Sequence, residues 1–142
     1  MSREQIRQDI VTAVEALKTG FPGAYPLVIE YDNILVIDTQ TQVNPYLRVD
    51  IKIIDMVQAD LSNDPTHRVH GQLVLVAGVK EGTGVKAANL ILDYFYPKLQ
   101  RKTFGSVHTH MATVTREVPH LGWLYLPVVI PFWSDIRYGV TP

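Results

Sequence analysis

Residues 69–79, in the middle of the chain, carry a hydrophobic residue at every second position except Gly71. One face of this stretch is apolar at a period of two, which predicts a strand with one buried side; its residues are Val69, Leu73, Leu75, Ala77 and Val79. From residue 85 the apolar residues recur every three or four positions, as in a helix with a broad buried stripe; they are Val85, Ala88, Leu92, Phe95 and Leu99. A strand followed by such a helix predicts a two-layer domain.

A second amphipathic helix is expected over residues 2–18, because its apolar residues also recur every three or four positions. They are Ile6, Ile10, Val14 and Leu17. Ser2 and Gln5 match a capping box at the start, and Gly20 and Pro22 match a helix stop at the end. Such a helix buries one stripe, so it must lie on a sheet or on a neighbouring subunit.

Further strands are indicated on both sides of the central unit. Residues 27–31 and 34–37 are short apolar pieces, and residues 104–117 are rich in Thr and Val. In residues 46–54, apolar and polar residues alternate from Leu47 to Ile53, which is typical of an antiparallel strand with one solvent-exposed side. The polar face of that strand carries Arg48, Asp50 and Lys52.

The last predicted strand, residues 123–136, is apolar on both faces. One face carries Leu124, Leu126, Val128, Ile130 and Phe132, and the other carries Trp123, Tyr125, Val129 and Trp133. Pro127 and Pro131 lack backbone N–H groups on the same side of the strand, which favours an edge strand or a bulge. Since a two-faced apolar edge strand makes an isolated monomer prone to aggregation, we expect oligomerisation to cover it.

Two polar stretches predict loops. Residues 38–45 end in Asn-Pro, and residues 55–67 have weak periodicity and contain the breaker run Ser-Asn-Asp-Pro. Long loops on small scaffolds are often binding segments. We therefore expect Met56, Val57 and Leu61 to become ordered against a partner.

Length and composition restrict the class of protein. A chain of 142 residues with 46% hydrophobic and 19% charged residues is an ordinary single globular domain. A formal net charge of -1 gives no electrostatic footprint for sequence-specific nucleic-acid binding. The chain has no cysteine, which excludes disulfides and thiolate chemistry. Neither a signal peptide nor a membrane span is evident, so we expect a soluble protein that is used without secretion.

The glycines before the second helix match a dinucleotide-binding pattern in spacing only. Gly82, Gly84 and Ala87 satisfy G-x-G-x-x-G/A, but residues 100–102, where the ribose-binding acid belongs, are Gln-Arg-Lys. We interpret the glycines as positive-φ residues of a tight turn, with Thr83 or Gly84 capping the helix. A small nucleotide-binding enzyme remains an alternative function.

Other catalytic patterns are weak. His108 and His110 lie two apart on a predicted strand and would bind a metal only if a carboxylate or His70 converged on them. We interpret both as hydrogen-bonded surface residues. No serine lies in a G-x-S-x-G elbow. The sequence therefore predicts no catalytic, metal-binding or cofactor-binding residue, and we expect a protein that is not an enzyme.

The order of these elements resembles the phage tail terminator family, which includes the lambda-type terminator and related minor tail proteins. The resemblance covers residues 2–138. It is carried by patterns of glycine and hydrophobicity: His70-Gly71, Gly82 and Gly84, Ala87-Ala88, and the aromatic, proline-broken final strand.

The resemblance implies an α+β fold, a mixed and mostly antiparallel sheet with two main helices packed on one face, in one domain over residues 1–142. It implies a virion protein, assembled in the cytoplasm of a bacterial host, whose hexameric ring caps the head-proximal end of the tail tube. That ring would stop tube polymerisation, bind the neck or head-tail connector, and let DNA pass through. Another neck or connector completion protein is the alternative.

Six residues are candidates for the contacts with a neighbouring copy or with the tube. They are Met56, Val57, Leu61, Tyr125, Val129 and Trp133. For the last three, packing within the chain is the competing interpretation.

Overall fold

The computed structural model describes residues 3–23, 26–31, 42, 44–58 and 66–137. Within these residues the elements are, in chain order, α1 (Arg3–Thr19), β1 (Ile29–Tyr31), β2 (Tyr46–Gln58), β3 (Thr66–Lys80), α2 (Lys86–Leu99), β4 (Thr103–Phe104), β5 (Val107–Thr109), β6 (Thr113–Val114), β7 (Val118–His120) and β8 (Trp123–Arg137).

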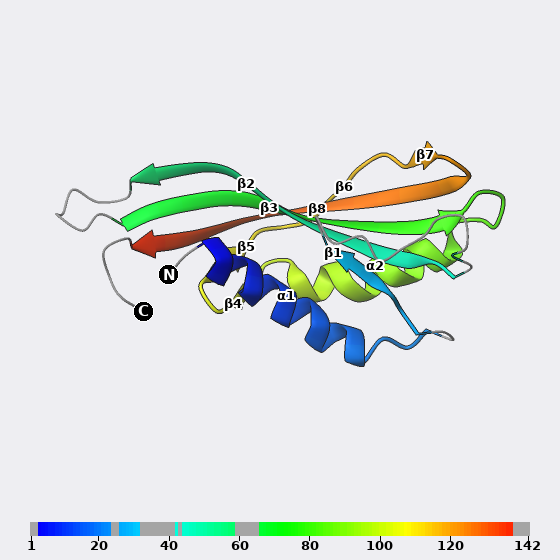
Figure 1. Cartoon of the computed structure of the whole chain (residues 1–142), viewed down its shortest axis with the longest axis horizontal. Coiled ribbons are helices and arrows are strands. Elements are labelled where there is room, and N and C mark those ends of the chain that lie inside the picture. Colours follow the sequence, from blue (N-terminus) through cyan, green and yellow to red (C-terminus); the bar gives the residue numbers. More distant parts are fainter. Residues whose placement is uncertain (1–2, 24–25, 32–41, 43, 59–65, 138–142) are drawn as a thin grey trace.

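Both helices lie on one face of a long twisted sheet (Figure 1). The strand order is β1-β2-β3-β8-β5-β4, and β6 and β7 also pair with β8. β1 is parallel to β2, and the other pairs are antiparallel. This is the predicted single-domain α+β fold, with a mixed, mostly antiparallel sheet.

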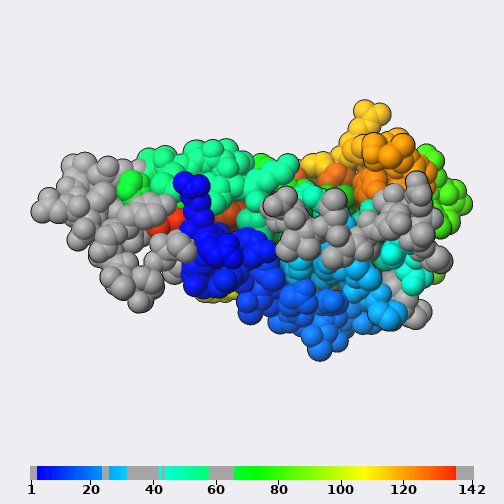
Figure 2. Space-filling view, in the orientation of Figure 1, coloured from blue at the N-terminus to red at the C-terminus, as the bar shows by residue number. Residues whose placement is uncertain are grey.

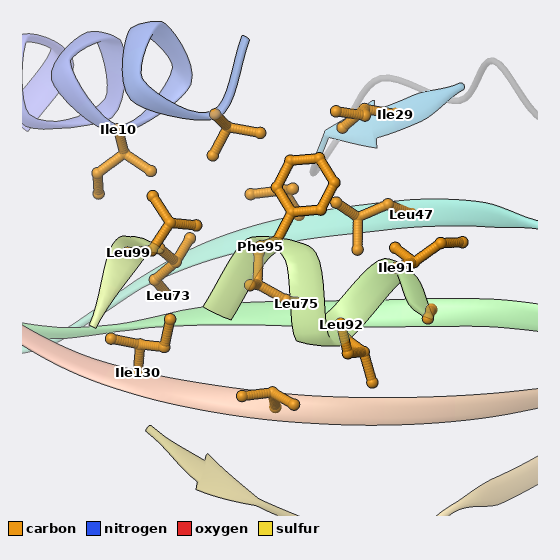
Figure 3. Packing of buried hydrophobic residues seen from close by; sticks show 14 of the residues in the cluster. Ile10, Ile29, Leu47, Leu73, Leu75, Ile91, Leu92, Phe95, Leu99 and Ile130 are labelled. Carbon is orange, nitrogen blue, oxygen red and sulfur yellow. The ribbon is translucent and has the colours of Figure 1, made fainter. Parts of the chain in front are cut away.

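The core fills the layer between the helices and the sheet (Figure 3). The predicted inward face of β3 is buried throughout, from Val69 to Val79, and the inward face of β8 includes Ile130 and Phe132. α2 contributes Ala88, Ile91, Leu92, Phe95 and Leu99, and α1 contributes Ile6, Ile10 and Val14. The helical and strand periodicities therefore identified most of the core, and they were wrong at Val85 and Ile53, which are exposed at the ends of the predicted elements.

The turn before α2 differs from the prediction in one respect. Gly82 and Gly84 have φ of 83° and 82°, as expected for a tight turn. The predicted cap is wrong, because the N-cap residue is Val85 and no side chain caps the helix. The Thr83 hydroxyl donates instead to the Lys80 carbonyl at 2.6 Å, which closes the turn.

The predicted loop over residues 55–67 is strand at both of its ends, residues 55–58 and 66–67. β2 continues to Gln58 and β3 begins at Thr66, with pairing from Asp55 opposite His70 to Gln58 opposite His67. A β-bulge at Ile54 shifts the register by one residue, and this shift hid the strand from a strict period of two. Residues 59–65, with Leu61, and residues 34–37 lie outside the described residues.

The ends of β2, β3 and β8 extend past the helices, on the left in Figure 1. We call this extension the arm; it comprises residues 53–58, 66–70 and 133–137. The three strands remain paired along it.

β8 is an interior strand, so its predicted edge position is wrong. It pairs with β3 along its whole length and with β5, β6 and β7 on its other side. The carbonyls of Pro131 and Pro127 accept from the N–H groups of His110 (2.8 Å) and Thr115 (3.2 Å). Since the N and C=O of a strand residue point to the same side, the missing N–H groups of both prolines also face residues 107–120.

The prolines explain why the predicted strand over residues 104–117 is broken. β5 pairs with Phe132 and Trp133, and β6 pairs with Val128 and Val129. Pro131 lies between these two sites and Pro127 lies beyond the second, before β7. The partner of β8 is thus divided into short pieces at the places where β8 offers no donor.

α1 is tied to the turn between β4 and β5 through Asp9. Asp9 Oδ2 accepts from the backbone N–H and the hydroxyl of Ser106, both at 3.2 Å. The buried Ser134 donates to the Ser106 hydroxyl at 3.1 Å. Gly105, with φ of 60°, leaves no room for a Cβ, which would lie 2.4 Å from Asp9 Oδ2.

We predict that Asp9→Ala lowers the free energy of unfolding by about 1–3 kcal/mol, because Ser106 loses its charged acceptor. Urea denaturation measures the change. Gln8→Ala, at an exposed position of the same helix, is the control and should change it by less than about 0.5 kcal/mol. Equal effects of the two variants would show that the contact adds nothing.

Gly71 gives a second prediction. A Cβ at this residue would lie 2.4 Å from Phe132 Cζ and 2.5 Å from the Lys52 carbonyl oxygen, so the Phe132 ring occupies the space that the glycine leaves. We expect Gly71→Ala to lower the free energy of unfolding by roughly 1–3 kcal/mol through overpacking. Gln72→Ala, on the opposite face of β3, is the matched control. A Gly71→Ala variant as stable as this control would refute the packing argument.

Candidate functional site

The face of the sheet opposite the helices carries the residues that the sequence assigned to an interface. Tyr125, Val129 and Trp133 all lie on this outer face of β8, since their register partners on β3 are the outward Gly78, Val74 and His70. Each of the three is partly buried. Their alternation was therefore predicted correctly, and the structure shows what each of them contacts within the chain.

An aromatic cluster closes one end of the outer face. The hydroxyls of Tyr46 and Tyr125 are hydrogen-bonded at 2.9 Å, and the ring of Tyr46 meets that of Trp123 edge-on at 5.2 Å between centroids. Gly78 lies between the two tyrosines, and a Cβ there would approach both rings to 3.0–3.1 Å. Tyr125 is therefore engaged by its own chain.

Burial raises the pKa of Tyr46, and the hydrogen bond to Tyr125 raises it further. Burial also raises the pKa of Tyr31, whose hydroxyl donates to Glu15 at 2.7 Å. Both hydroxyls are thus held in the neutral form in the folded protein, because the charged form would be poorly solvated.

Trp133 marks the other end of the outer face, on the arm. Its ring stacks on His108 of β5 with centroids 4.1 Å apart, and the guanidinium carbon of Arg68 of β3 lies 4.1 Å from the ring centroid. Asp135 accepts two hydrogen bonds from Arg68, at 3.0 and 3.2 Å. Beside them His70 Nδ1 lies 2.7 Å from Asp55 Oδ1. The indole is therefore held between two neighbouring strands by a cation and an imidazole.

The other predicted interface residues divide between the two faces. Val57 is 54% exposed and lies opposite Arg68, next to the Trp133 cluster. Met56 lies opposite the buried Val69 and packs against the core. Leu61 is outside the described residues. The structure thus places Val57 beside Arg68, which stacks on Trp133, and places Met56 against the core.

Among the described residues, His108 and His110 do not form a metal-binding group with His70 or with a carboxylate. His108 Nδ1 is 3.0 Å from the Thr103 hydroxyl, and its ring stacks on Trp133. His110 is exposed. Within the described part of the chain, no group of three or more His, Cys, Asp or Glu residues is placed to hold a metal ion.

The glycine turn lies in the wrong topology for a dinucleotide site. The fingerprint belongs to a strand-helix-strand unit with two parallel strands. Here the long strand that follows α2 and pairs with β3 is β8, and it is antiparallel to β3. The geometry of Gly82 and Gly84 is that of a turn.

Two features that the sequence did not indicate lie on opposite edges of the sheet. The first is a groove of about 280 Å³ between α2 and β6, which we call the acidic groove. Its apolar lining includes Leu92, Leu126 and Val128, and its charged lining residues are Asp93 and Glu117. Val114, which also lines it, is 68% exposed, and Leu90 of α2 and Val118 of β7 are 58% and 51% exposed.

The second feature lies along β2 beyond its described pairing with β1, which ends at Val49, and beside the start of α1. We call it the basic edge. A depression of about 170 Å³ there is lined by Arg3, Glu4, Ile6, Arg7, Ile51 and Ile53. Ile53 and Ile54 are 38% and 59% exposed. Figure 2 shows the first turns of α1 beside β2 on the surface. In the sequence, the two adjacent isoleucines that end the alternating pattern of residues 46–54 could have indicated this exposed apolar surface.

Comparison with known proteins gives a fold and no function. No protein-family model matches the sequence, and no curated protein is similar to it. Among nine matching solved chains, one has 13% sequence identity, a TM-score of 0.69 and 99% coverage of both chains. Its name carries no functional meaning, and at this identity the likeness shows the shared fold alone.

In the described part of the chain, neither helix combines the length and the hydrophobicity that crossing a membrane requires.

Tyr46 gives a prediction for alkaline pH. The pKa of Tyr46 is raised in the folded state above its ordinary value of 10.0. The contribution of Tyr46 to the free energy of unfolding is therefore complete below about pH 10 and is lost as the pH rises further, because the unfolded chain then ionises first. Tyr46→Phe should therefore flatten the loss of stability between about pH 10 and pH 12, and Tyr31, whose pKa is also raised, should maintain the remaining slope. Urea denaturation at several pH values measures the slope.

The control for this prediction is Val74→Ala on the same face, which should lower stability equally at every pH. An unchanged slope in Tyr46→Phe would contradict the assignment.

Proposed function

We propose that this protein is a structural component of a phage tail, a terminator whose ring of identical subunits caps the head-proximal end of the tail tube. The proposal rests on the sequence resemblance together with the exposed apolar residues at both edges of the sheet. Ring closure would stop addition of tube subunits, and the free side of the ring would bind the neck.

The single observation that carries the proposal is the difference between the two edges. Ile53 and Ile54 are exposed at one edge, and Val114 and Val118 are exposed at the other. A monomer gains nothing from exposing apolar side chains on two unlike edges. Unlike patches on opposite sides of a subunit support head-to-tail contacts, which close into a ring when the rotation between subunits permits.

The charge of the chain is compatible with this role. A formal net charge of -1 leaves no general attraction to a polyanion. A subunit that lines a passage for DNA benefits from weak contacts, because tight binding would hold the DNA in the channel.

The proposal predicts that the purified protein forms one discrete closed oligomer. Light scattering should give a mass that is a fixed multiple of 16.0 kDa, and negative-stain images should show rings, expected to contain six subunits. Added to a polymerising tail-tube protein, the rings should fix the tube length and appear at one tube end.

A protein that stays monomeric and leaves tube growth unchanged would overturn the proposal. Rings that ignore the tube but bind a head-tail connector would instead indicate a neck completion protein.

A further inference from the structure

We infer that the acidic groove of one copy of this chain binds the basic edge of the next copy. This inference rests on the ring proposed above. This contact is heterologous, because each copy offers the groove on one side and the edge on the other. The partner of each surface is therefore a second molecule of the same protein.

The acidic groove has the shape and charge of a receptor for apolar side chains flanked by cations. Its apolar lining, from α2 and β8, includes Leu92, Leu126 and Val128. The described residues that line the groove include the carboxylates Asp93 and Glu117 and include no cationic side chain. A ligand that fits must bring apolar groups to this lining and positive charge to the carboxylates.

The basic edge offers this combination. Arg3 and Arg7 of α1 line the same depression as Ile51 and Ile53 of β2. Ile54 is the extra residue of the bulge and is 59% exposed, so it projects where β2 departs from regular pleating. Arg7 forms an ion pair with Glu4 at 3.3 Å, and Arg3 adds a further positive charge to the same depression.

The position of the two surfaces makes the contact repeatable. β2 lies toward one end of the strand order and β6 pairs with β8 on the side away from β3, so the sheet separates them. Both surfaces also lie where a helix meets the sheet, α1 for the edge and α2 for the groove. A copy bound at one surface therefore leaves the other free for the next copy, as ring assembly requires.

Other occupants fit less well. A nucleic acid would be repelled by Asp93 and Glu117, and an acidic peptide likewise. A symmetric dimer through one surface would place carboxylate against carboxylate or arginine against arginine. The second copy, turned so that unlike surfaces meet, satisfies both the apolar and the charged groups.

Charge reversal tests the contact. The variant Asp93→Lys/Glu117→Lys and the variant Arg3→Glu/Arg7→Glu should each raise the concentration needed for assembly at least tenfold, because like charges then face one another. The quadruple variant, with all four changes in one chain, should recover most of the native assembly. Glu81→Lys and Lys102→Glu, exposed charges outside both surfaces, are the matched controls and should assemble as the native chain does.

Light scattering over a concentration series gives the readout, and circular dichroism confirms that each variant folds. Double variants that assemble normally, or a quadruple variant no better than the doubles, would overturn the inference. If the native chain forms rings while these substitutions have no effect, only the inference fails. A native chain that never assembles removes the ring proposal as well.

Cross-linking provides a second test that does not depend on charge. Because the chain has no cysteine, a bismaleimide linker reacts only with introduced thiols. A mixture of Ile54→Cys and Val114→Cys should give a cross-linked pair of one chain of each kind. Replacing Val114→Cys by Gln8→Cys should abolish that pair, and a pair formed equally well with this control would contradict the assignment.

Discussion

The structure depends on the different rise per residue of strands and helices. β3 and β8 pair over 15 residues, which at about 3.3 Å per residue extends to roughly 50 Å. α2 has 14 residues and at 1.5 Å per residue covers only about 21 Å. Helices of this length cannot cover such a sheet, so part of its surface must be stabilised by the sheet's own side chains or by another molecule.

The chain solves part of this problem internally. Next to the arm, Phe132 fills the space over Gly71 on the inward side of the sheet, and on the arm Trp133 is held by Arg68 and His108 on the outward side. At the other end, Gly78 allows Tyr46 and Tyr125 to meet. Large aromatic groups beside glycines therefore replace the missing helices on the central strands. The edges receive no comparable cover among the described residues, and there the exposed isoleucines and valines remain.

Sequence periodicity predicted the helices, the three long strands and the buried face of each, because burial of one face imposes a period that survives in the residue order. Prediction from periodicity failed where an element was interrupted by a feature that does not repeat along the chain. The bulge at Ile54 reversed the pattern of β2, and the prolines of β8 acted on a neighbouring segment. Both candidate surfaces combine residues far apart in the chain, such as Arg3 with Ile53 or Asp93 with Glu117, and no local pattern marks such pairs.

The prolines connect the fold to assembly. Pro127 and Pro131 remove hydrogen-bond donors on the side of β8 away from β3. No continuous strand of the described residues therefore pairs with β8 there, and β6 has only two residues. A short, interrupted edge is a poor template for unlimited strand pairing, yet it opens the space beside α2 in which the acidic groove forms. Pro127 and Pro131 thus discourage indiscriminate edge-to-edge pairing and leave room for the groove that we propose as a docking surface. The ring that we propose would need both effects, because its subunits would associate in one geometry and then stop.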